Sequence, residues 1–65
     1  MIITQTRYGY QLQTNSGKMY AIEPTGTGYK SKPIPKQPMV GILVHGIPNK
    51  IKRICFELNK NIYSQ

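Results

Sequence analysis

The side chains that could act as an acid, a base or a nucleophile are few in this chain of 65 residues. They are Glu23, His45, Cys55 and Glu57. A cysteine beside a histidine can form a reactive thiolate, and we expect His45 and Cys55 to lie on neighbouring strands. No third group is suggested that would orient such a pair, and a single cysteine in an apolar strand is usually buried. We therefore expect no catalytic residue and a protein that is not an enzyme.

Metal and phosphate sites are not indicated either. One cysteine, one histidine and two glutamates, none of them at a ligand spacing, do not form a tetrahedral metal site. Gly26 and Gly28 form a GxG close to Lys30, but a phosphate-binding loop would need further glycine or a GK[ST] ending, with a helix after it. Pro33 disfavours that helix. We expect no metal and no cofactor.

Basic and aromatic residues are the more informative group. Nine Lys and Arg residues stand against two acidic ones, which gives a formal net charge of +7 and a pI near 9.9. Such an excess attracts polyanions, and interleaved tyrosines can stack on bases while the cations contact phosphates. Tyr29 is the most available tyrosine, because we expect it in a loop. The candidate binding residues are Arg7, Lys18, Tyr29, Lys30, Lys32, Lys36, Lys50, Lys52 and Arg53.

The first 23 residues predict a β-hairpin. Over residues 2–14, even positions carry aliphatic, aromatic or threonine side chains and odd positions mostly carry glutamine, arginine or glycine, with Ile3 as the exception. This alternation is typical of a strand with one face toward a core. A turn at 14–18 then contains asparagine, serine and glycine, and 18–23 resumes the strand pattern. Gly9, inside the first strand, indicates a bulge or a sharp bend.

The segment 24–38 predicts a connecting loop, because it contains four prolines and two glycines. Within it, KPIPKQP matches the +xxPxxP spacing of an SH3-domain ligand through Lys32, Pro35 and Pro38. Such short matches arise often by chance, and free docking peptides are more common at chain termini. We interpret the segment as a connector that its prolines stiffen and that holds its lysines at the surface.

The last third of the chain predicts one buried strand and one ambiguous element. The apolar run MVGILVHG at 39–46 predicts a central, well-buried strand. From residue 50 the sequence fits a helix, with an apolar stripe that begins at Ile51, or a strand with Ile54, Phe56 and Leu58 on one face. A helix would place three cations at the positive end of its dipole and leave Phe56 in water. We therefore predict a strand through Leu58, with the helix as the alternative.

Together these elements predict a single small basic domain over residues 1–65, with the connecting loop at 24–38. The expected fold class is mostly β: an antiparallel meander, or an SH3-like or OB-like barrel, of four or five strands. If the last element is a helix from about residue 50, the fold becomes α+β. An open sheet would have exposed outer strands, and a homodimer could form through one of these edges.

Two functions fit this composition. The first is a non-enzymatic protein that binds DNA or RNA through its basic, tyrosine-containing surface. The second is a small inhibitor or adaptor, encoded by a phage or plasmid, that binds an acidic surface of a host protein. Residue types with AT-rich codons (Ile, Lys, Asn and Tyr) make up 25 of the 65 residues, which favours such an origin. With neither a signal peptide nor a membrane-spanning apolar run, we expect a cytoplasmic protein without a membrane partner.

Overall fold

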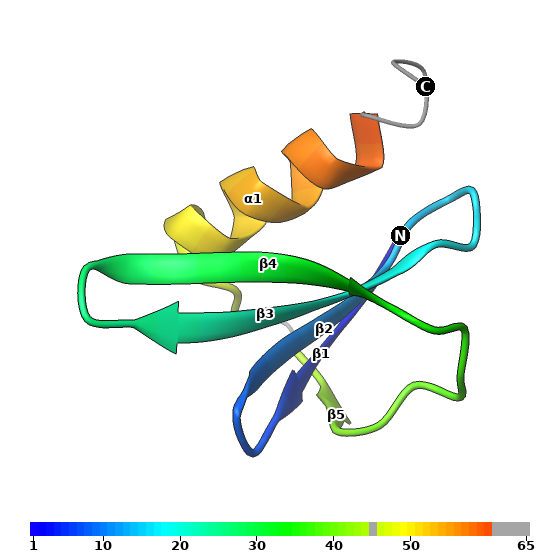
Figure 1. The fold of residues 1–65 in the computed structure, drawn as a ribbon, viewed down its shortest axis with the longest axis horizontal. Coiled ribbons are helices and arrows are strands. Elements are labelled where there is room, and N and C mark those ends of the chain that lie inside the picture. The colour runs from blue at the N-terminus through cyan, green and yellow to red at the C-terminus, as the bar shows by residue number, and fades with distance from the viewer. Residues whose placement is uncertain (45, 61–65) are drawn as a thin grey trace.

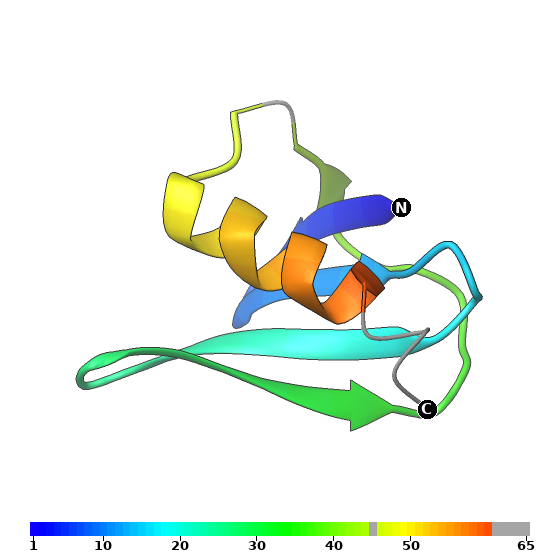
Figure 2. The same cartoon turned by 90° about the horizontal axis from the view of Figure 1, so that it is seen from above.

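The chain forms one open antiparallel sheet with a helix on one of its faces (Figures 1 and 2). The computed structural model describes residues 1–44 and 46–60. Within them the sheet runs in the order β4-β3-β2-β1-β5, so that β4 and β5 are its outer strands. The elements are β1 (Ile2–Thr6), β2 (Gly9–Gln13), β3 (Met19–Thr25), β4 (Gly28–Ile34), β5 (Ile42–Leu43) and α1 (Asn49–Lys60).

This architecture confirms the mostly β antiparallel prediction and corrects the predicted barrel. The two outer strands, β4 and β5, lie at opposite edges of the sheet and do not pair with each other in the described residues. The reason is the path of the chain after β4. Over residues 35–41 the chain crosses from the β4 edge to the opposite edge of the sheet. There it adds only a two-residue strand, which cannot close the sheet.

The predicted first strand is itself a hairpin. β1 pairs with β2 through a register that matches Ile3 with Leu12 and Thr6 with Gly9, so the chain turns at Arg7 and Tyr8. The break in alternation at Ile3 reflects this turn. Side chains directly opposite each other in an antiparallel pair point to the same face, and this places an odd-numbered residue of β1 beside an even-numbered residue of β2.

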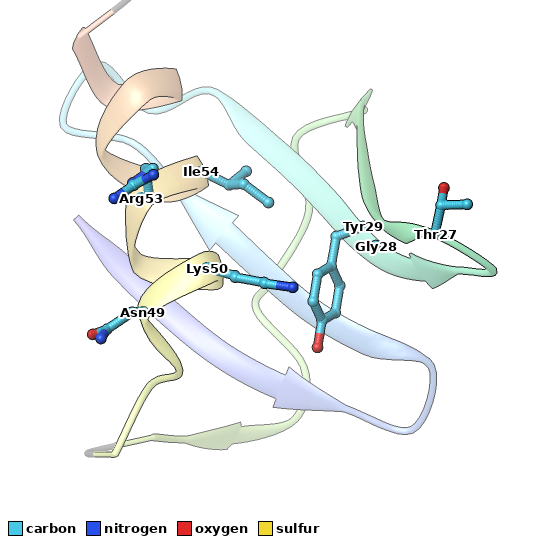
Figure 3. A pocket seen from close by; sticks show the side chains of 7 residues that line it. All are labelled: Thr27, Gly28, Tyr29, Asn49, Lys50, Arg53 and Ile54. Carbon is cyan, nitrogen blue, oxygen red and sulfur yellow. The ribbon is translucent and has the colours of Figure 1, made fainter.

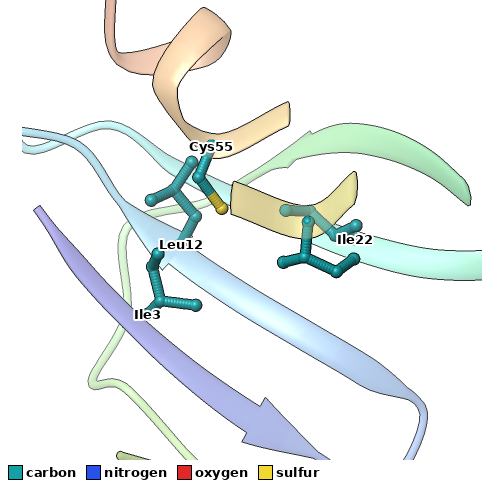
Figure 4. Close-up of a cluster of buried hydrophobic side chains, with 5 residues drawn as sticks. Ile3, Leu12, Ile22 and Cys55 are labelled. Carbon is teal, nitrogen blue, oxygen red and sulfur yellow. The ribbon is translucent and has the colours of Figure 1, made fainter. Parts of the chain in front are cut away.

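The core lies between the sheet and α1 (Figure 4). Its buried members are Ile3, Leu12 and Ile22 from three successive strands and Ile51 and Cys55 from the helix. Four of them are completely inaccessible to solvent, all except Ile3. Burying one such aliphatic side chain stabilises the fold by about 1.5–3 kcal/mol, so this small cluster supplies much of the driving force.

The helix is the larger correction to the C-terminal prediction. A strand through Leu58 was expected, with a helix from about residue 50 as the alternative. The structure confirms the alternative, and residues 49–60 form α1. Its stripe of Ile51, Ile54, Cys55 and Leu58 packs on the sheet, with Ile51 and Cys55 fully buried. This burial outweighs the unfavourable dipole and the exposure of Phe56, which is 51% accessible. The far end of α1 is fixed to the β2–β3 turn, where the Asn15 N–H donates to Asn59 Oδ1 at 2.9 Å.

The predicted loop at 24–38 is largely strand. Residues 19–34 form the β3–β4 hairpin with a turn at 26–27, and only 35–38 is loop. Prolines are tolerated here because β4 is an outer strand, where a missing N–H on the open side removes no sheet hydrogen bond. Pro33 lies in β4 opposite Tyr20, and Pro24 lies near the end of β3. The KPIPKQP segment therefore spans the end of β4 and the start of the crossing loop.

The crossing loop, residues 35–41, covers the sheet face opposite α1. The Thr4 hydroxyl donates to the Val40 carbonyl at 2.7 Å, and the Val40 N–H donates to Gln11 Oε1 at 3.3 Å. The Gln37 N–H donates to Met19 Sδ at 3.3 Å. These contacts accompany the burial of Thr4 and Met19, so the loop covers part of the sheet face opposite α1.

The apolar run at 39–46 is not the central, buried strand that was predicted. Only Ile42 and Leu43 pair with β1, and they form the outer strand β5. Their side chains are 76% and 61% exposed. A short apolar run has the same appearance in a central strand and at an edge, and here the order of the strands decides its place. No helix in the described part of the chain is long and apolar enough to cross a membrane.

Substitution of Gly9 tests the close approach of β2 to β3. A Cβ at this position would overlap the Ile22 carbonyl oxygen, and the φ of 152° is unfavourable for any other residue. We expect Gly9→Ala to lower the free energy of unfolding by roughly 2–4 kcal/mol in urea titrations. Gly26→Ala is the control, because nothing lies within 4 Å of its Cβ position. Equal stability of the two variants would contradict this account of the strand pairing.

Candidate functional site

The exposed face of α1 carries a concentration of positive charge. Since Ile51 and Cys55 face the sheet, the residues on the other side of the helix point to solvent. The helix contains four cations against one acid, a net charge of +3, and its first turn contains no acidic residue. The exposed residues of this face are Asn49, Lys50, Lys52, Arg53, Phe56, Glu57 and Lys60.

A cleft of about 430 Å³ lies between the β3–β4 turn and the first two turns of α1. We call it the Tyr29 cleft. Figure 3 shows the Lys50 side chain pointing toward the Tyr29 ring, with Ile54 directed into the space beside them. A cation next to an aromatic ring over an apolar floor suits a flat group that carries negative charge at its edge. The lining residues are Thr27, Gly28, Tyr29, Asn49, Lys50, Arg53 and Ile54.

A second hollow, of about 280 Å³, adjoins this cleft along the helix. Its walls include Lys52, Phe56 and Glu57, and it shares Asn49 and Arg53 with the Tyr29 cleft. In Figure 3 the Arg53 side chain points away from Tyr29, toward the outer side of the helix. The two hollows together form one surface with two aromatic rings and three cations. We call it the α1 surface; it consists of Tyr29, Lys50, Lys52, Arg53 and Phe56.

The structure brings four of the nine predicted binding residues together, namely Tyr29, Lys50, Lys52 and Arg53. Tyr29 faces α1 because its register partner, Pro24, is on the same sheet face as Ile22. The helix places the three cations within its first five residues. Tyr29 is separated from them by more than twenty positions in the sequence, and only the packing of α1 on the β3–β4 hairpin makes them neighbours.

The other five predicted residues lie elsewhere. Lys30 and Lys32 alternate with Tyr29 along β4 and so lie on the face opposite α1. Lys32 Nζ is 3.7 Å from Glu23 Oε1, a solvent-exposed ion pair that contributes little stability. These two lysines do not contribute to the α1 surface.

The remaining three are at two other turns. Lys18 follows Gly17 in the β2–β3 turn, and Lys36 approaches the same turn, since a Cβ on Gly17 would lie 3.7 Å from Lys36 Nζ. Arg7 is in the β1–β2 turn, where it lines a separate hollow of about 330 Å³ beside Tyr8. The predicted basic patch is therefore several patches. The α1 surface combines three cations with two aromatic rings, whereas the hollow at Arg7 combines a single cation and Glu23 with the rings of Tyr8 and Tyr10.

Phe56 is the residue that the sequence reasoning missed. Its exposure was used as an argument against a helix, and the structure shows the helix with Phe56 exposed. In helical register Phe56 follows Lys52 by four residues and Arg53 by three, so these cations are its neighbours on the surface. An exposed aromatic between cations was thus already visible in the sequence, provided that residues 49–60 were taken as helical.

The catalytic candidates show no arrangement for chemistry in the described residues. Cys55 is fully buried, and burial raises the pKa of its thiol from 9.0 to about 11. A nucleophilic cysteine needs the opposite shift. Glu23 is paired with Lys32, and His45 lies outside the described residues. No group of three metal-ligating side chains occurs within the ranges 1–44 and 46–60.

No protein-family model matches this chain. Searches of curated proteins and of solved structures also returned no significant match. The α1 surface presents exposed rings, cations and a helix N-terminus with no acid in its first turn.

The buried thiol of Cys55 makes stability depend on pH. The unfolded thiol ionises near its ordinary pKa of 9.0, and the folded one near 11. This contribution is therefore complete below pH 9 and is lost as the pH rises toward 11, because only the unfolded chain then releases the proton. Between pH 8 and pH 10.5 we expect the wild type to lose roughly 2 kcal/mol more than Cys55→Ala in urea titrations. Equal losses would contradict the assignment.

The cations at the start of α1 are expected to destabilise the helix. We expect Lys52→Glu to raise stability by about 0.3–1 kcal/mol, because an acid at this end interacts favourably with the helix dipole. Lys60→Glu makes the same charge change in the last turn and should lower stability by a similar amount. Thermal unfolding at low salt measures both as shifts of a few degrees in Tm. Shifts of the same sign would show that the dipole does not control them.

Proposed function

We propose that this chain is a non-enzymatic nucleic-acid-binding protein and that it binds a single-stranded segment of DNA or RNA along the α1 surface. The observation that carries the proposal is the joint position of Tyr29 on β4, Phe56 on α1 and the three cations in the first five residues of α1. Rings stack on unpaired bases while cations contact the phosphates between them, which is the usual chemistry of single-strand binding.

The location of the cations supports a role beyond solubility. Lys50, Lys52 and Arg53 are at the positive end of the helix dipole, where they reduce helix stability. The first hydrogen bond of the helix is donated by the Lys52 N–H to the Pro48 carbonyl, so the N–H groups before it have no helical acceptor. Free N–H groups, a positive dipole and three cations together favour a phosphate.

The two rings support bases as the groups between the phosphates. Tyr29 is 37% exposed and Phe56 is 51% exposed, and the hollows beside them share Arg53. Stacking of a base on an exposed ring contributes about 1–3 kcal/mol and tolerates any base. The proposal therefore includes no sequence specificity: cations give the affinity its salt dependence, and the rings favour unpaired over paired bases.

An acidic surface of a partner protein is the second candidate for the same cations. A phage- or plasmid-encoded inhibitor of a host factor would act in this way. Carboxylates would engage Lys50, Lys52 and Arg53, but they would leave the exposed rings of Tyr29 and Phe56 without a specific role. The exposed rings therefore favour a nucleic acid over an acidic protein surface as the partner.

Fluorescence anisotropy with labelled single-stranded DNA and RNA, titrated at several salt concentrations, tests the proposal. We expect the double variant Lys50→Ala/Arg53→Ala to bind at least about tenfold more weakly and with a shallower salt dependence. Lys18→Ala/Lys36→Ala removes the same charge at the β2–β3 turn and should bind within roughly threefold of the wild type, since only the general field changes.

The rings have their own test in the same titration. Tyr29→Ala and Phe56→Ala should each weaken single-strand binding by about tenfold while leaving the salt dependence unchanged. Equal losses for the two double variants would show that only net charge matters and would overturn the proposed surface. Absence of oligonucleotide binding at low salt would reject the function, and binding of an acidic peptide in its place would support the second candidate.

A further inference from the structure

Large apolar side chains are distributed unusually in this chain. Within the described residues, six hydrophobic residues are buried while eight large ones are exposed. Five of the eight lie in β1 or β5 or within two residues of these strands: Met1, Ile2, Val40, Ile42 and Leu43. Ile42 is the most exposed of all eight, at 76%. Residues 1–44 and 46–60 of a monomer thus leave more large apolar side chains exposed than they bury in the core.

The two outer strands differ in whether their residues hinder pairing with a strand of another molecule. β4 carries Lys30, Lys32 and Pro33, which are the residues that usually prevent another strand from adding to an edge. β5 carries none of these, and the flanking residues 39–44 and the neighbouring 1–6 contain no charged side chain. The outer side of β5 has no neighbouring strand among the residues that the structure describes. One edge is protected, and the other is neutral, apolar and open.

A hollow of about 300 Å³ lies beside this open edge. The residues that line it all have apolar side chains, and they come from the N-terminus, β5 and the segment that leads to α1. It provides room for apolar side chains of a partner that pairs with β5. The lining residues are Met1, Ile2, Ile3, Leu43, Val44 and Ile47.

We propose that two copies of this chain pair through β5, antiparallel to each other, about a two-fold axis perpendicular to the sheet. The charge distribution selects a second copy as the partner. Copies with a net charge of +7 repel each other least across a surface without charged side chains, and the β5 edge is such a surface. An acidic partner would gain nothing from an edge that has no cations.

The length of β5 supports the same partner. Two residues provide too few backbone hydrogen bonds to hold a peptide strand by themselves. In a two-fold pair the same edge and the same exposed side chains contribute from both copies, so that Ile42 and Leu43 of each become buried together. Small domains with thin cores are commonly stabilised in this way.

The symmetry places both α1 helices on the same side of the joined sheet, because antiparallel pairing about this axis preserves the faces. Joint binding by the two copies rests on the proposed function: if that function is correct, the two α1 surfaces can bind one nucleic-acid strand together and increase its apparent affinity. The pairing itself depends only on β5 and its neighbours.

Sedimentation and light scattering of the full chain test the pairing. The protein should be free of nucleic acid and in about 0.5 M salt, so that neither an oligonucleotide nor charge repulsion affects the result. We expect a mass twice that of the 7.4 kDa chain, with dissociation on dilution. Ile42→Lys should be monomeric. Ser31→Lys is the control, since it adds the same charge to an exposed position of the other outer strand, on the same sheet face.

Cross-linking identifies the edge. Ile42→Cys should form a disulfide-linked dimer on mild oxidation, whereas Ser31→Cys should remain at background. Cys55 does not compete, because it is buried. A monomeric wild type, a dimer that survives Ile42→Lys, or equal cross-linking at the two positions would each overturn the proposal. Oligonucleotide binding by a monomer would leave the proposed function intact, so the two proposals fail independently.

Discussion

The packing of α1 on the sheet is the contact on which the rest of this structure depends. Leu12 and Ile22 from the sheet meet Ile51 and Cys55 from the helix, and all four are completely buried (Figure 4). In a chain this short no second core exists in the described residues to compensate for its loss. The same contact fixes the rotation of the helix about its axis, and thereby decides which residues face solvent.

That rotation connects stability to the proposed function. With the apolar stripe turned inward, Lys50, Lys52 and Arg53 must point outward at the end of the helix where positive charge is least favourable. The core therefore sustains a helix whose first turn works against it. Places where a sequence departs from local preference while the fold holds are frequently binding sites. Here the departure coincides with two exposed rings, Tyr29 and Phe56, and with the cleft between α1 and the β3–β4 turn.

Charged side chains, like the exposed apolar ones, are concentrated on particular elements of the fold. Cations occupy the helix, the protected edge at β4 and the turns, whereas β1 and β5 are neutral. In the two proposals, one surface attracts a polyanion and another pairs with a second copy, and this separation of charge keeps the two surfaces apart. Neither property hinders the other, because the β5 edge and the exposed face of α1 are formed by different elements.

The sequence by itself determined the mostly β class, the excess of positive charge and the cation cluster at 50–53, because these follow from composition and local alternation. Tertiary structure decided the rest. From residue 50 the local pattern fits both a strand, which we predicted, and a helix, and the helix forms because its apolar stripe covers one face of the sheet. Prolines exclude a central strand but not the outer strand β4, and an apolar run at 39–46 does not reveal whether it lies at the centre or the edge. Tyr29 joins Lys50 only through packing, which no local pattern encodes.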